Sequence, residues 1–323
     1  MGRWLAARVA HALVTLAVAV TLLFFLMRVV PGDPLSRLSD DRPISPREIA
    51  RLRERYGLDQ PIGRQYAAFL TGAARGDLGV SIEFGRPVTR LIAERLPATL
   101  LLGGTVLLLN FTLGLWLGVR QAVRQGRATD RWLEVASLAG YSVPSFWLGL
   151  LLAWLAATHW RILPSGGMHD VLLERDAGGA RIVLDVLRHL ALPALTLSLV
   201  SIAATMRYQR TAMLEALAFP FVQTARAKGI TERRVVWHHA WRNALFPVIT
   251  LFGLWLPVLV TGSVFVEQVF AWPGLGSLAA GAVGGRDYPL LMGTALLAST
   301  LVVAGGLLAD LLYALLDPRV RHA

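Results

Sequence analysis

The residues of this chain that could do chemistry are few and scattered. Ser142 lies in the sequence GYSVP (140–144), which partly matches the turn that presents a serine nucleophile but lacks its final glycine. The adjacent pair His238 and His239 would point in different directions on a helix, which makes a poor metal site. The chain has no cysteine, so thiolate ligands and disulfides are excluded. An intramembrane protease is therefore a remote interpretation.

Nucleotide chemistry is also unsupported by the sequence. No Gly-x-x-x-x-Gly-Lys-Ser/Thr segment is present, so the chain lacks the usual loop that cradles ATP phosphates. The zinc-protease pattern His-Glu-x-x-His is absent as well. We therefore predict that the chain is not an enzyme and has no catalytic residue. We also expect it to bind no metal and no cofactor.

Two acidic residues, Glu267 and Asp310, lie at the ends of long apolar stretches. Ionisable side chains in a membrane are candidates for a transport path. We take these two residues, together with Ser142 and Pro144, as candidates for translocation or gating. Each acidic residue also has a structural explanation, either as a cap at the membrane boundary or as the partner of a nearby arginine.

The elements that would hold these residues are long and apolar. Hydrophobic residues make up 55% of the chain and charged residues only 16%. A helix needs about 20 apolar residues to cross a bilayer. Six uncharged stretches approach or exceed that length: 9–27, 96–119, 135–160, 189–206, 243–266 and 288–309. We predict an all-α integral membrane protein with six transmembrane helices, the first of them uncleaved because no small-x-small site follows it.

The formal net charge of +11 is explained by basic loops rather than by nucleic-acid binding. Arginines gather at the N-terminus, in 120–131, in 207–242 and at the C-terminus, and these segments alternate with the others. We therefore place both termini in the cytoplasm. The division expected is 1–30 for the N-terminus and first helix and 31–95 for an extracytoplasmic insert. Helices 2–6 form a core over 96–323, with a cytoplasmic loop at 207–244.

The insert is expected to contain two short helices. Ser45 is a natural N-cap, Pro46 suits the first turn, and Gly57 can end the helix. Apolar residues from Ile62 onward indicate a second helix, and residues near Val88 lead into the second span. The insert is either a spacer or a docking surface for an external partner, and its pattern favours neither.

The cytoplasmic loop contains the most specific signal. A short helix is predicted over 221–228, with Gly229 just past its end in the left-handed conformation. Thr231 can cap a second helix that has Glu232 in its first turn. The result is a compact helix–glycine–helix protrusion, and it contains Lys228, the only lysine of the chain.

The residue order Gln223-Thr224-Ala225-Arg226-Ala227-Lys228-Gly229, with Asn243-Ala244-Leu245-Phe246-Pro247 downstream, resembles the EAA loop of binding-protein-dependent ABC transporter permeases. The resemblance is to the dipeptide/oligopeptide/nickel family, to the first of its two permease subunits, and it covers nearly the whole chain. Further matching segments are Pro31-Gly32-Asp33-Pro34, Tyr56-Gly57-Leu58-Asp59-Gln60-Pro61, Gly76-Asp77-Leu78-Gly79, Ser142-Val143-Pro144-Ser145-Phe146-Trp147, Val266-Glu267, Trp272-Pro273-Gly274-Leu275-Gly276 and Asp317-Pro318-Arg319. The chain departs from the general pattern at Gln223 or Thr224, where an acidic residue is usual.

The resemblance implies a type I ABC importer permease fold in the bacterial cytoplasmic (inner) membrane, surrounded by lipid. It implies a second homologous permease subunit, one or two cytoplasmic ATPase subunits that bind ATP and Mg, and an extracytoplasmic substrate-binding protein. No nucleic acid is expected. The residues expected to contact the ATPase are Phe221, Ala225, Lys228, Gly229, Ile230 and Glu232.

The resemblance also implies di- or oligopeptides as the substrate. Nickel chelates, glutathione and other small solutes remain open. A secondary transporter is a remote alternative, because the sequence shows neither inverted repeats nor charges at mid-membrane. An ion channel is remote as well, because no segment looks like a selectivity filter.

Overall fold

The computed structural model describes residues 2–29, 35, 45–170, 172, 178–255 and 264–316. Among these residues every regular element is a helix, apart from one antiparallel bridge between Val80 and Pro87. The helices preceding the break at residues 143–144 are α1 (Gly2–Val29), α3 (Pro46–Arg55), α4 (Ile62–Ala74), α5 (Val88–Leu109), η1 (Asn110–Gly114), α6 (Leu115–Val123) and α7 (Ala128–Ser142). Those following it are α8 (Ser145–Ala153), η2 (Trp154–His159), α9 (Gly179–Ala218), α10 (Pro220–Ala227), α11 (Glu232–Arg234), η3 (Val235–Ala240), α12 (Trp241–Ala244), α13 (Phe246–Trp255), α15 (Val264–Val269), α16 (Leu275–Gly285) and α17 (Tyr288–Leu316).

Four helical stretches are long and apolar enough to cross a membrane: Trp4–Val29, Val88–Val123, Gly179–Ala218 and Tyr288–Leu312. They contain the predicted spans 9–27, 96–119, 189–206 and 288–309. The predicted span 243–266 passes through 256–263, which lie outside the described residues, so α13 and α15 give only its two ends. The motifs at 31–34 and 317–319 also lie outside the described residues.

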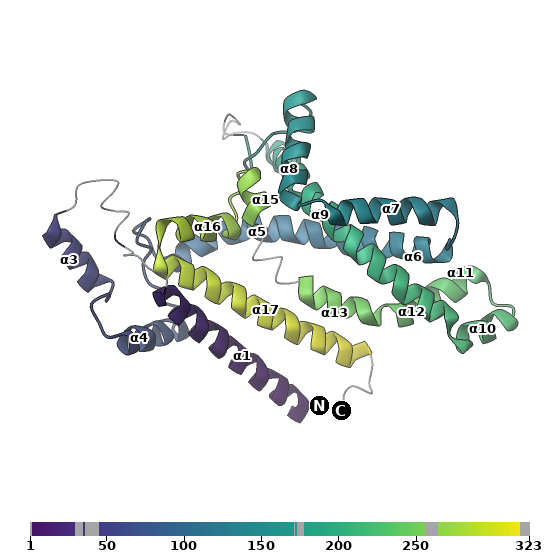
Figure 1. The fold of residues 1–323 in the computed structure, drawn as a ribbon, viewed down its shortest axis with the longest axis horizontal. Helices are drawn as coiled ribbons and strands as arrows, with labels where there is room; N and C mark the ends of the chain where they lie inside the picture. The colour runs from purple at the N-terminus through teal and green to yellow at the C-terminus, as the bar shows by residue number, and fades with distance from the viewer. Residues whose placement is uncertain are drawn as a thin grey trace.

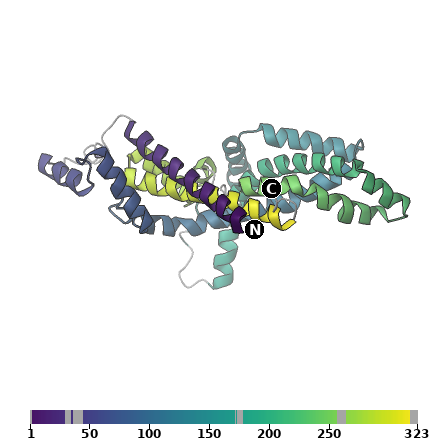
Figure 2. The same cartoon turned by 90° about the horizontal axis from the view of Figure 1, so that it is seen from below.

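The helices form an elongated molecule with α9 at its centre. The insert helices α3 and α4 lie at one end of the long axis, and α10 and α11 lie at the other (Figure 1). α9 packs against α5, η1, α6, α7 and α8. α1 and α17 lie side by side and run in opposite directions, which the turned view also shows (Figure 2). An ion pair of 3.2 Å between Arg8 Nη1 and Asp310 Oδ2 joins the first turns of α1 to the last turns of α17.

The predicted third span, 135–160, is not one straight helix. α7 and the α8–η2 helix meet at an angle of 99°. Val143 and Pro144, which separate them, both have extended backbone conformations. Proline disfavours a helical conformation in the residue before it, so α7 ends there. A continuous apolar stretch does not show whether the helix within it is straight or bent, so hydrophobicity alone did not predict this bend.

The boundaries of other predicted segments also differ. The first residues of the predicted loop 207–244 continue α9 as far as Ala218. α9 also begins at Gly179, ten residues before the predicted span 189–206. Between the predicted spans 243–266 and 288–309 the chain forms a further helix, α16.

The insert helices agree with the sequence pattern. Ser45 caps α3, and its hydroxyl accepts a hydrogen bond of 3.2 Å from the backbone N–H of Glu48. Gly57 follows the C-cap with φ +63°. The start of α17 anchors the insert, because the buried Asp287 carboxylate accepts hydrogen bonds from the Ser81 hydroxyl and the Glu83 backbone N–H. The insert is therefore attached to the helical bundle through polar contacts.

Candidate functional site

Residues 220–234, which comprise α10, α11 and the turn between them, are called the helix–glycine–helix segment below. It begins where α9 ends at Ala218 and Phe219 adopts an extended conformation. Pro220 then occupies the first turn of α10, where its missing N–H costs nothing. α10 runs to Ala227, which agrees within one residue at each end with the predicted helix 221–228. The chain therefore turns sharply away from α9 into a separate short helix.

Gly229 ends α10 as predicted. Its φ is +71°, in the left-handed region that an L side chain rarely adopts. The Gly229 N–H donates to the Arg226 carbonyl at 2.9 Å, and the Ile230 N–H donates to the Ala225 carbonyl at 3.2 Å. These two bonds form a complete Schellman motif. Thr231 occupies the N-cap position of α11, although its side chain makes no capping hydrogen bond.

One face of the segment is buried against the chain's own helices. Val222 is fully buried and Ala225 is 5% exposed. They join a core cluster with Met213 of α9, Val119 of α6 and Val235 of η3. The Ala225 side chain is therefore turned inward in this chain, and its expected contact with the ATPase stays a prediction. Its small size lets α10 pack closely on the core.

The opposite face of the segment is exposed. The Phe221 side chain is 40% exposed and stacks on Phe219, with ring centroids 5.8 Å apart. Lys228, the C-cap residue of α10, and Glu232, the first residue of α11, are also exposed. Ile230 is half-buried and packs against the core cluster. Exposed aromatic rings beside charged groups are typical of protein–protein contact surfaces.

An ion pair joins the two helices of the segment across Gly229. Arg226 Nε and Nη2 donate to the two carboxylate oxygens of Glu232 at 3.1 and 2.6 Å. The Arg226 guanidinium holds the pKa of Glu232 below its ordinary value, mainly through this hydrogen bond. Stability from the pair is therefore present above the unfolded pKa of the carboxyl and lost as the pH falls through the lowered folded pKa. Both side chains are about half exposed, so the pair contributes under about 1 kcal/mol.

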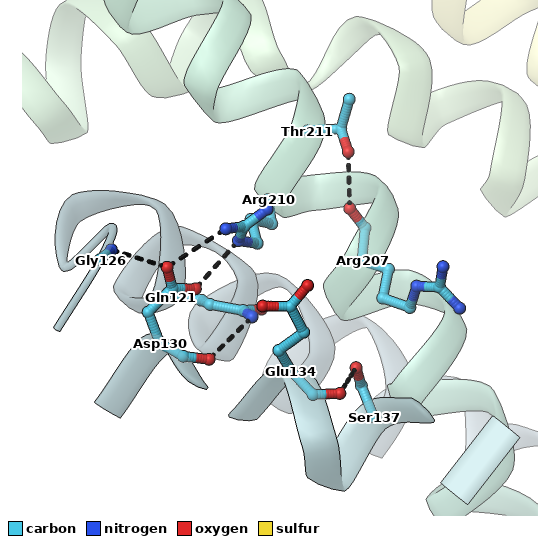
Figure 3. A network of polar contacts seen from close by, with 8 residues as sticks. All are labelled: Gln121, Gly126, Asp130, Glu134, Ser137, Arg207, Arg210 and Thr211. Carbon is cyan, nitrogen blue, oxygen red and sulfur yellow. Dashed lines mark hydrogen bonds and ion pairs between the residues drawn. The ribbon is translucent and has the colours of Figure 1, made fainter. Parts of the chain in front are cut away.

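A second ion pair fixes α9 just before the segment. Arg210 of α9 donates to both carboxylate oxygens of Asp130 at 3.0 and 3.1 Å (Figure 3). Asp130 also accepts a bond of 2.9 Å from the Gly126 N–H, and its carbonyl accepts one from the Gln121 amide. Only 4% of the Asp130 side chain is exposed. The network joins the turn between α6 and α7 to α9.

Sequence reasoning did not find this network, because its two charges are 80 residues apart. A weak signal was present: Asp130 is the lone acidic residue within the otherwise basic segment 120–131. Such a residue at the start of a helix is usually explained by the helix dipole alone. The long-range partner is visible only in the structure.

α6 and α9 approach closely enough to require glycine. A Cβ atom on Gly118 would lie 2.6 Å from Gln209 Cβ and 2.7 Å from the Met206 carbonyl oxygen. Small residues at helix contacts in membranes allow this kind of packing. The segment, α6 and α9 are therefore held together by apolar packing, by close backbone contact and by the Asp130–Arg210 pair.

The candidates for the translocation path have separate surroundings. Ser142 donates to the Leu138 carbonyl at 2.8 Å, and Pro144 forms the break between α7 and α8. The buried Glu267 accepts a bond of 2.7 Å from the Ser277 N–H in the first turn of α16, while its other carboxylate oxygen has no partner among the described residues. Asp310 pairs with Arg8. Glu267 thus contacts the start of a helix and Asp310 an arginine, and the role of both residues in translocation or gating stays a prediction.

The described residues bring no group of three or more histidine, aspartate or glutamate side chains close enough to hold a metal ion. What the segment presents is a surface with an anchored side and an exposed side. Its exposed face has an aromatic pair, a lysine and a bridging ion pair. Its buried face packs directly on side chains of α6 and α9.

Comparison with known protein families gives two matches that together span nearly the whole chain. The family described as "Binding-protein-dependent transport system inner membrane component" matches residues 110–322. The N-terminal family of binding-protein-dependent transport system membrane components matches residues 1–103.

Individual proteins are similar over the same length. The dipeptide transport system permease protein DppB of Escherichia coli (strain K12) is 37% identical over 321 residues, covering 94% of this chain and 95% of that protein. The oligopeptide transport system permease protein AppB of Bacillus subtilis (strain 168) is 40% identical, covering 93% of each chain. The di/tripeptide transport system permease protein DppB of Pseudomonas aeruginosa (strain UCBPP-PA14) is 40% identical, covering 94% of each chain.

Proposed function

This chain belongs to the family of binding-protein-dependent transport system inner membrane components, and on that premise we propose how it works within a peptide importer. It is a multi-pass protein of the bacterial inner membrane and a permease subunit of an ABC transporter for peptides. A substrate-binding protein delivers the peptide from outside. A second homologous permease subunit completes the pathway, and one or two cytoplasmic ATPase subunits bind ATP and Mg.

The helix–glycine–helix segment is the contact with an ATPase subunit. The observation that carries this role is the division of the segment into an anchored face and an exposed one. Val222 and Ala225 fasten it to the core, whereas Phe221, Lys228 and Glu232 remain exposed. Gly229 and Ile230 form the turn between α10 and α11. A partner that grips this surface moves α9 and α6 with it.

The proposed topology has six spans, with both termini and the segment in the cytoplasm and residues 31–95 outside. The Arg8–Asp310 pair supports it, because it brings the start of α1 and the end of α17 to one side. The positions of the insert helices and of α10 and α11 at opposite ends of the molecule support it too (Figure 1). The core of helices 2–6 then spans 96–323.

Transport requires at least two arrangements of the bundle, and partners shift the balance between them. The Asp130–Arg210 pair couples α9 to the turn between α6 and α7, so these helices move as one unit. α8 leaves that unit at the bend next to Pro144, and we take this bend as a candidate hinge. We assign ATP hydrolysis to the partner subunits and the conformational change to this chain.

Reconstitution of the complete importer tests the proposal. The chain, the second permease, the ATPases and the binding protein are placed in liposomes, and ATP hydrolysis is measured with each solute in turn. Di- or oligopeptides should stimulate hydrolysis and accumulate inside. Stimulation only by a nickel chelate or by glutathione would keep the importer but change its substrate. Uptake without any ATPase subunit would contradict the proposal and favour a secondary transporter.

A further inference from the structure

A cavity of about 380 Å³ is lined by residues of the C-terminal end of α1, the start of α17 and the insert helix α4. These three elements lie near one another at one end of the molecule (Figure 1). Three arginines line it: Arg28, Arg55 and Arg64. Asp77 is the one acidic residue among the described residues that line it, and its Oδ1 already accepts a hydrogen bond of 2.9 Å from the Gly79 N–H. The cavity therefore carries a net positive charge.

Arg28 is the most enclosed of the three arginines. Its Nε and Nη2 donate to the Gln65 side-chain oxygen at 3.3 and 2.8 Å, and its guanidinium lies 4.1 Å from the centre of the Phe24 ring. Its Nη1 is buried and has no hydrogen-bond partner among the described residues. Leaving a charged donor unsatisfied is costly, so a small shift of the guanidinium toward an acceptor in the cavity is favourable.

The position of Arg28 along α1 places it at the membrane boundary. Arg8 and Arg28 bracket the uncharged stretch 9–27. Twenty residues of helix rise about 30 Å, which matches the hydrocarbon thickness of a bilayer. Arg8, at one boundary, pairs with Asp310 at 3.2 Å. Arg28, at the other, has no such acidic partner among the described residues, and it lies at the depth of the lipid headgroups.

The surface of α1 beside the cavity is suited to lipid contact. Large apolar side chains are exposed on the part of the helix near Arg28, with Leu22 65%, Leu26 59% and Val29 78% exposed. Exposed apolar surface of this extent on a membrane helix indicates contact with acyl chains. The cavity thus lies beside a lipid-facing helix rather than within the packed bundle.

We propose that this cavity binds the phosphate of an anionic phospholipid headgroup, with Arg28 as its main ligand. The planar guanidinium matches the oxygens of a phosphate, and Arg55 and Arg64 add positive charge. Phe24 and Tyr288 provide apolar surface for the glycerol and upper acyl region. The bound lipid would hold α1, α17 and the insert together. The site depends on the membrane location and is independent of the ATPase contact.

The test uses the purified full-length chain within its complex, delipidated in detergent and titrated with dihexanoyl phosphatidylglycerol while its thermal unfolding is followed. Arg28→Gln should raise the lipid dissociation constant about 10-fold or more, as expected for loss of a charge-assisted contact. Arg28→Lys, which keeps the charge, should lose less lipid affinity. This variant is measured instead if Arg28→Gln does not assemble into the complex. Arg75→Gln, at an exposed arginine that does not line the cavity, should have no effect.

Two further ligands identify the chemistry. Inorganic phosphate should compete with the lipid at higher concentration, and dihexanoyl phosphatidylcholine should bind more weakly because its headgroup has no net charge. Equal affinities of wild type and Arg28→Gln for phosphatidylglycerol, or absence of competition by phosphate, would overturn the proposal. So would a variant that binds the lipid normally but loses affinity for the substrate-binding protein, because the cavity would then belong to that partner.

Discussion

Substitution of Gly229 separates the two roles that this glycine can have, which are backbone shape and partner contact. Its φ is +71°, and a Cβ atom added there would meet nothing within 4 Å in this chain. Alanine therefore adds backbone strain without a clash, at a cost of about 1–2 kcal/mol. That cost shifts the local equilibrium between the ordered and unravelled turn about 5- to 30-fold. Asparagine tolerates this conformation better and should cost less.

Tryptophan at position 229 adds bulk to the strain that alanine already introduces. The first 4 Å around a Cβ atom at this position are empty in this chain, so the bulk extends outward to where a partner would sit. Peptide uptake and ATP hydrolysis are measured on the same proteoliposomes, and their ratio reports coupling. We expect the ratio to fall modestly for Gly229→Ala, less for Gly229→Asn and almost completely for Gly229→Trp.

The matched control is Gly85 in the insert, which also has a left-handed conformation, with φ +64°, and open space at Cβ. Gly85→Trp should leave the ratio of uptake to hydrolysis unchanged. Normal uptake by Gly229→Trp would refute the assignment of the segment as the ATPase contact. Equal losses for Gly229→Ala and Gly229→Trp would mean that only the shape of the turn matters.

The remaining predictions concern the packing around the segment and are read from unfolding measurements. Asp130→Ala should lower the free energy of unfolding by about 3 kcal/mol, which is the lower end for a broken buried pair because Arg210 is 24% exposed. The double variant Asp130→Ala/Arg210→Met should recover part of this loss, and an equal loss in the single and double variants would contradict the pairing. Glu232→Gln should cost under about 1 kcal/mol at pH 7, and the cost should vanish as the pH falls through the lowered folded pKa of the carboxyl, below which it is protonated in both states; a cost that persists in acid would show that charge is not its cause. Gly118→Ala should cost about 1–3 kcal/mol, whereas Gly104→Ala, with open space at Cβ, should cost nothing; equal effects would falsify the close approach of α6 and α9.

Local features were predictable because their causes lie within a few residues. Ser45 and Gly57 bound α3 as expected, and Gly229 closes α10 through the hydrogen bonds that a left-handed residue allows. The four long apolar helices were predictable because bilayer thickness sets the length of an uncharged stretch in a membrane protein. In each case the residues that cause the feature are next to one another in the sequence, so a local pattern is enough to predict it.

Features that depend on distant residues were not predictable. The Asp130–Arg210 pair joins residues 80 apart, and no local pattern indicates which of the arginines the aspartate meets. The 99° bend at Pro144 needs the packing of α8 on neighbouring helices, although the proline itself marked a break. The inward orientation of Ala225 follows from the core beneath α10, so helix periodicity alone did not separate its buried face from its exposed one.

Cross-linking through Lys228 tests the central claim most directly. The chain has no other lysine side chain, so a short amine-reactive cross-linker attached there reports the surroundings of the helix–glycine–helix segment. In the purified importer we predict a cross-link between Lys228 and an ATPase subunit, identified by peptide mapping and absent from the Lys228→Arg variant. A Lys228 cross-link to the substrate-binding protein, or labelling of Lys228 in intact cells by a reagent that cannot cross the inner membrane, would contradict the account.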